Sequence, residues 1–152
     1  MIRHLLAVTL LVLVATPALA ANPMKVTADS FVVDQGKSQA TFTGSVVIAR
    51  DDLTVWAVKV VVEYGAGGVN DITNVLATGN VRLKTDEQDA TGNRATFDPK
   101  SQIFRLSGNV TVVNEMGTLH GPELVLNLAE KTSVFSSGGS GRVTGLFTSA
   151  PQ

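Results

Sequence analysis

The sequence predicts an all-β protein: an elongated, slightly twisted antiparallel β-structure, built from repeated units and open at both ends. Three observations lead to this prediction. A glycine recurs with apolar residues at fixed distances on both sides, at Gly44, Gly79 and Gly108. The residues around each glycine alternate between apolar and polar, which is the period of a strand with one buried face. No stretch shows the sustained apolar stripe of a helix.

The repeated unit is 35 residues long from Gly44 to Gly79 and 29 residues long from Gly79 to Gly108. A second apolar group follows each glycine at 11, 13, 16 and 18 residues. The step from 13 to 16 is three residues, an odd number, so it reverses which side chains face inward. A bulge or corner is therefore expected between these two positions. Repetition of this kind favours a stacked form (a sandwich, a jelly roll or a solenoid) in which each unit buries its neighbour. A partial earlier copy is present at Val26, Ala28, Phe31 and Val33.

Turn-forming residues separate the expected strands. The first strand is expected over 24–33, and late strands at about 124–135 and 143–147, the last two joined by a flexible Gly/Ser segment at 136–141. A glycine-rich insertion at 65–71 lengthens the first repeat interval. The other turn signals lie at 34–36, 50–52, 85–88, 98–100 and 114–117.

Both ends of the chain are expected to lie outside the folded domain. Arg3, an apolar run over 5–15 and the small residues at 18–20 predict a secretory signal cleaved after Ala20. The run is shorter than a spanning helix needs, although an uncleaved anchor is the alternative. The remainder is expected to form one domain over 21–147, followed by a flexible tail at 148–152.

Composition excludes several classes of function. The chain has 13 acidic and 12 basic residues, so bulk charge does not predict a nucleic-acid partner. It has no cysteine, so an exported domain must be stabilised by hydrophobic burial alone. His120 has no second imidazole or thiol near it in sequence, and the adjacent acids of 51–52 and 86–87 are typical of solvated turns. We therefore expect no enzyme activity, metal or cofactor; a cupin-like enzyme would need clustered ligands.

One element occurs three times in register and carries a family resemblance. Together with the opening and closing segments of the domain, it resembles the OstA-like family over about residues 24–147. The resemblance implies a V-shaped β-jelly roll with an apolar interior, located in the periplasm, that carries lipopolysaccharide by its lipid A acyl chains. The segments concerned are Phe42-Thr-Gly-Ser-Val-Val-Ile48, Ala77-Thr-Gly-Asn-Val-Arg-Leu83, Leu106-Ser-Gly-Asn-Val-Thr-Val112, Val26-Thr-Ala-Asp-Ser-Phe31 and Gly141-Arg-Val-Thr-Gly-Leu-Phe147.

The chain departs from the family pattern in two places, the glycine-rich insertion and an Ala-Asp pair that is retained only at Ala28-Asp29. The inward positions are nevertheless predicted to form a lipid-contacting wall, because an exposed acyl chain costs about 0.8 kcal/mol per methylene in water. A closed core of the same residues is the alternative interpretation. The predicted wall residues are Phe31, Val33, Phe42, Val46, Ile48, Val55, Leu83, Phe97, Phe104, Leu106, Val112, Leu119 and Leu126.

The two open edges predict the partners. The resemblance implies that the amino-terminal strand receives an inner-membrane OstA-like partner or a preceding copy, and that the late strands offer an edge to an outer-membrane translocon. Copies would associate head to tail through main-chain pairing. The outward cations Arg82, Lys84, Arg94 and Arg105 are either solvated or contacts for lipid phosphates. An inner-membrane-anchored relative and a structural fibre subunit are the alternative functions.

Overall fold

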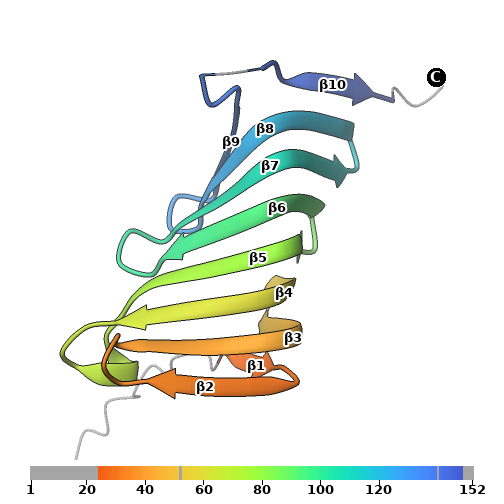
Figure 1. Ribbon diagram of the computed structural model, residues 1–152. Helices are drawn as coiled ribbons and strands as arrows, with labels where there is room; N and C mark the ends of the chain where they lie inside the picture. Colours follow the sequence, from red (N-terminus) through yellow and green to blue (C-terminus); the bar gives the residue numbers. More distant parts are fainter. Residues whose placement is uncertain (1–23, 52, 140, 149–152) are drawn as a thin grey trace, which may run out of the picture.

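The computed structural model describes residues 24–51, 53–139 and 141–148. These residues form a single ten-stranded sheet whose strands stack side by side along the molecule (Figure 1). Every pairing is antiparallel, and the only helical element described is a short 3-10 turn, η1. The prediction of an all-β jelly roll is confirmed. The elements are β1 Lys25–Thr27, β2 Ser30–Asp34, β3 Gln39–Arg50, β4 Leu53–Tyr64, η1 Gly68–Asn70, β5 Ile72–Lys84, β6 Gln88–Asp98, β7 Ile103–Asn114, β8 Gly117–Asn127, β9 Thr132–Ser136 and β10 Thr144–Phe147.

The strands follow one another in chain order, with a divided strand at each end. From β3 to β8 each strand pairs with the next. Strands β1 and β2 both pair with β3, β1 with its second half and β2 with its first half. In the same way β9 and β10 pair with different halves of β8. The sheet therefore ends in two edges, and the outer sides of β2 and β10 pair with no other described strand.

A line of bulges crosses the sheet near the middle of its strands. The pairing shifts by one residue at this line in each ladder from β3–β4 to β7–β8. Gly44, Gly79 and Gly108 lie on the line with φ between +81° and +84°, and each is followed by a residue that also has positive φ. These are the bulges that the odd step in the repeat predicts. They bend the sheet into two halves that pack against each other.

Neighbouring side chains explain why these bulge positions are glycine. A Cβ at Gly79 would stand 2.6 Å from the Cβ of Val58 on the preceding strand, and a Cβ at Gly44 would stand 2.3 Å from Asp29 Oδ2. Asn93 covers the glycine of the third copy in the same way. Asp29, Val58 and Asn93 occupy the same slot of the repeat, and each packs over the glycine of the next strand. This arrangement needs a small residue below and tolerates Asp, Val or Asn above.

The core lies between the two halves and is one continuous cluster. Every fully buried side chain among the described residues is apolar. Because burying a Leu or Val side chain contributes about 1.5–3 kcal/mol, this cluster accounts for stability without disulfides. The largest fully buried members are Leu83, Leu106, Leu124, Val46, Val60, Val81 and Val110.

The predicted signal sequence over 1–20 lies outside the described residues, as do residues 149–152 of the predicted tail. The first tail residue is part of the fold, since the Thr148 N–H donates to the Met116 carbonyl at 3.3 Å. Within the described residues, no helix has the length and apolarity needed to cross a bilayer.

Candidate binding groove

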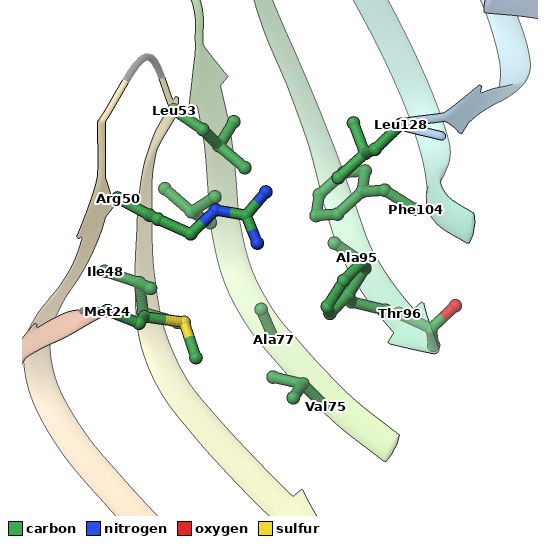
Figure 2. A pocket seen from close by; sticks show the side chains of 12 residues that line it. Met24, Ile48, Arg50, Leu53, Val75, Ala77, Ala95, Thr96, Phe104 and Leu128 are labelled. Atoms are coloured by element: carbon green, nitrogen blue, oxygen red, sulfur yellow. The ribbon is translucent and has the colours of Figure 1, made fainter. Parts of the chain in front are cut away.

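A groove opens between the two halves of the bent sheet, with an empty volume of about 620 Å³ when its open mouth is included. One wall comes from the end of β3, the start of β4 and the residue before β1, and the other from β5, β6, β7 and the residue after β8. Figure 2 shows Ile48 and Leu53 on one wall facing Phe104 and Leu128 on the other, whereas the Thr96 side chain points away from the space between them. The lining residues are Met24, Ile48, Arg50, Leu53, Val55, Val75, Ala77, Ala95, Thr96, Phe97, Phe104 and Leu128.

The bulges create this groove. Val55 pairs with Leu83 on one side of the bulge line, whereas Ala77 pairs with Val60 on the other side. In a flat sheet Val55 and Ala77 would lie far apart along the strands, because a strand advances about 3.3 Å per residue. Both line the groove because the sheet folds at the bulges and turns their inward faces toward each other. The repeated glycine is therefore the sequence feature that positions the site.

The chemistry of the groove suits a hydrocarbon. Ten of its twelve lining residues are apolar, and the exceptions are Arg50 and Thr96. An aliphatic chain placed here exchanges water for apolar contacts, which contributes about 0.8 kcal/mol per buried methylene. Among the described residues there is no group of three His, Cys, Asp or Glu side chains that could hold a metal ion. His120 lies on the outer face and hydrogen-bonds Thr111 through its Nδ1 at 2.9 Å.

The structure places the thirteen predicted wall residues in three settings. Four line the groove: Ile48, Val55, Phe97 and Phe104. Seven belong to the packed interior beside it or around it: Val46, Leu83, Leu106, Val112 and Leu126 are buried, and Phe42 and Leu119 are half-buried against them. The remaining two, Phe31 and Val33, lie on the edge strand β2 and are 57% and 47% exposed.

Sequence reasoning did not select the other eight lining residues. Val75, Ala77 and Ala95 occupy inward slots of the repeat but were not distinguished from core positions. Met24, Leu53, Thr96 and Leu128 also line the groove. Arg50 is part of the turn signal at 50–52, yet it also follows Val46 and Ile48 at the two-residue spacing of inward side chains. Extending this two-residue alternation to the end of the strand identifies Arg50 as an inward residue.

A second, more polar hollow adjoins the groove at the ends of the strands, and we call it the polar vestibule. It has an empty volume of about 1060 Å³ including open solvent, and it shares Arg50, Leu53 and Leu128 with the groove. The apolar groove thus continues into a space suited to a polar group. The remaining lining residues are Thr85, Asp86, Glu87, Gln88, Leu126, Asn127, Lys131, Thr132 and Ser133.

Both edges of the sheet expose apolar side chains. On β2, Val32 is 59% exposed, and Phe31 stacks on Phe42 with ring centroids 4.6 Å apart. On β10, Leu146 and Phe147 are 70% and 67% exposed. An edge strand with free backbone groups and apolar side chains is a template for pairing with another strand.

Two of the four outward cations are held in ion pairs on the outer face. Arg82 Nε donates to Asp89 Oδ1 at 2.8 Å, and Arg82 Nη2 donates to Asp89 Oδ2. The guanidinium carbon of Arg82 lies 5.2 Å from the centroid of the Trp56 ring. The hydrogen bond from Arg82 holds the pKa of the Asp89 carboxyl below its usual value. Arg105 bonds Glu123 at 2.5 Å. These contacts tie neighbouring strands together on the face opposite the groove.

A sequence profile described as LptA/(LptD N-terminal domain) LPS transport protein matches residues 25–132. The chain belongs to this family. The OstA-like resemblance is thereby confirmed, and the LPS-transport family places the chain in a transport class. The apolar groove and the two open edges are therefore features of a member of a lipopolysaccharide-transport family.

Two known proteins are similar to this chain, one in sequence and one in structure. An uncharacterised protein of Rhizobium meliloti (strain 1021) is 28% identical over 100 residues, which cover 62% of this chain and 54% of that protein. The chain thus spans about half the length of that curated relative. The crystal structure of LptH of Pseudomonas aeruginosa, described as the LptA homologous periplasmic component of the lipopolysaccharide transport device, superposes with a TM-score of 0.71 at 18% identity. The match covers 84% of this chain and 96% of LptH, and it confirms the fold.

Proposed function

We propose that this LptA-family protein is a periplasmic carrier of lipopolysaccharide that holds lipid A acyl chains in the groove between its two sheet halves. The observation that carries the proposal is the groove itself, an open apolar space within a family of lipopolysaccharide-transport proteins. A chain of about twelve methylenes gains about 10 kcal/mol on leaving water. This is the free energy that a carrier must supply to take such a lipid across an aqueous layer.

Direct acyl contact is proposed first for Ile48, Val55, Phe97 and Phe104, because they combine an inward position with an open groove surface. The buried members of the predicted wall support these residues from behind. Phe31 and Val33 lie on the edge strand, where acyl contact would require the groove to continue into a neighbouring molecule.

The bridge mechanism is part of the same proposal. Copies would pair head to tail, the β10 edge of one against the β2 edge of the next, and such a contact extends without closing. The β1–β2 edge would receive an inner-membrane OstA-like partner, and the β9–β10 edge an outer-membrane translocon. The exposed apolar side chains of both edges support this arrangement. The predicted signal sequence and the periplasmic location of LptH support export to the same compartment.

Photo-crosslinking in cells tests the proposal. A photoreactive residue at Phe104 lies in the groove, and one at Val113 lies on the outer face of the same strand, where the side chain is 50% exposed. We expect lipopolysaccharide to be captured at Phe104 and not at Val113. Equal labelling at both positions, or no labelling at Phe104, would contradict a lipid-carrying groove.

A structural fibre subunit is the second candidate, because both edges of the sheet are free. It predicts filaments of the purified protein with no lipid captured at Phe104. The same crosslinking experiment therefore separates the two candidates.

A further inference from the structure

We propose that the polar vestibule binds the headgroup of the lipid whose acyl chains occupy the groove, and that Arg50 binds a phosphate of that headgroup. This inference rests on the proposed function. It adds the residue that binds the phosphorylated headgroup of that lipid.

Arg50 lies where the apolar groove meets the polar vestibule and lines both. It is the last residue of β3 and continues the inward series of Val46 and Ile48, so it projects between the two halves rather than outward. Figure 2 shows its guanidinium group reaching into the space between the wall of Ile48 and the wall of Phe104. A ligand with chains in the groove would place its polar end beside this group.

The electrostatic setting of Arg50 differs from that of the paired outward arginines. Arg82 and Arg105 are neutralised by Asp89 and Glu123. Arg50 is half-buried, and within the described part of the chain it forms no salt bridge. A guanidinium beside apolar surface gains most from an anion that it can bind with two parallel N–H donors. A phosphate matches that geometry.

The rest of the vestibule is polar and of mixed charge. Its lining includes a second cation, Lys131, and the two acidic residues at 86–87. Gln88, Thr132 and Ser133 offer amide and hydroxyl groups that can bond sugar hydroxyls. The vestibule's empty volume of about 1060 Å³ includes open solvent, so part of a headgroup can extend out of it.

The test compares two ligands with the same acyl chains, bisphosphorylated lipid A and its fully dephosphorylated form. Capture of each is measured with the purified protein carrying the photoreactive residue at Phe104. We expect the unsubstituted site to prefer the phosphorylated lipid by roughly tenfold, the effect of a charge-assisted hydrogen bond at a partly exposed site. R50Q should remove that preference, so that the two lipids are captured to the same extent. R94Q, on the exposed outer face of β6, is the matched control and should keep the preference.

The outcomes separate this inference from the proposed function. Capture of the dephosphorylated lipid by R50Q shows that the variant folds and that its groove works. A preference retained in R50Q, no preference in the unsubstituted protein, or loss of both lipids in R50Q would overturn the role of Arg50. Absence of any lipid at Phe104 in every variant would instead overturn the lipid-carrying groove, and this inference with it.

Discussion

The bulge at Gly79 is the most informative position to perturb, because it bends the sheet that forms the groove. In Gly79→Ala the new residue must adopt φ near +84°, which costs an L-residue about 1–2 kcal/mol. Its Cβ would also lie 2.6 Å from the Cβ of Val58, so the two strands must move apart. Overpacking of this kind costs about 1–3 kcal/mol. We expect the free energy of unfolding to fall by about 2–5 kcal/mol.

Urea unfolding followed by the fluorescence of Trp56, the single tryptophan, measures this loss. Gly139→Ala is the matched control, because Gly139 has φ of +83° and a Cβ there would meet no atom within 4 Å. It should lose only the backbone part, about 1–2 kcal/mol or less. A double-mutant cycle of Gly79→Ala with Val58→Gly isolates the steric part, and the coupling should be about 1–3 kcal/mol.

Equal losses in Gly79→Ala and Gly139→Ala, together with no coupling to Val58, would refute the steric explanation of the repeated glycine. The bend would then depend on backbone conformation alone. A larger loss in Gly79→Ala than in Gly139→Ala, with the excess removed by Val58→Gly, would establish that packing across neighbouring strands selects glycine at the bulge.

Two further predictions follow from the edge strand and the outer ion pair. Leu146→Lys on β10 should raise the dissociation constant of head-to-tail association, measured by light scattering, at least roughly tenfold. Because the Leu146 side chain is 70% exposed, the free energy of unfolding of the protomer should change by less than about 0.5 kcal/mol. Val69 lies in η1 and is 74% exposed, so Val69→Lys is the control and should leave association unchanged. Equal weakening of association by the two variants would contradict a contact through the β10 edge. The lowered pKa of Asp89 stabilises the fold above the unfolded-state pKa, about 3.8, and this contribution is lost as the pH falls through the lower folded-state pKa. The stability difference between wild type and D89N should therefore be full at neutral pH and vanish in acid; a difference independent of pH would exclude the Arg82 pair as its cause.

The segments expected as single strands over 24–33 and at about 124–135 are each interrupted, at 28–29 and at 128–131. The sequence by itself determined the fold class and the position of the bend. These features depend on local patterns: the two-residue period of each strand, turn-forming residues between strands, and a glycine where the backbone has positive φ. The open edges were also predictable, because the first and last units of the array have no neighbour on their outer side. The glycine-rich insertion was predicted to connect strands, and it contains η1 between β4 and β5.

Only the tertiary structure decided which inward residues line an open groove. Val55 and Leu83 are direct cross-strand partners and both face inward, yet Val55 lines the groove while Leu83 has no exposed surface. Alternation along a strand reports which face a side chain occupies, but not how far away the opposite layer lies. Arg50 was missed for a related reason, since a charged residue at the end of a strand has the same local pattern as a turn. The separation of the two halves is set by side chains far apart in the sequence, and that separation distinguishes a binding surface from a core.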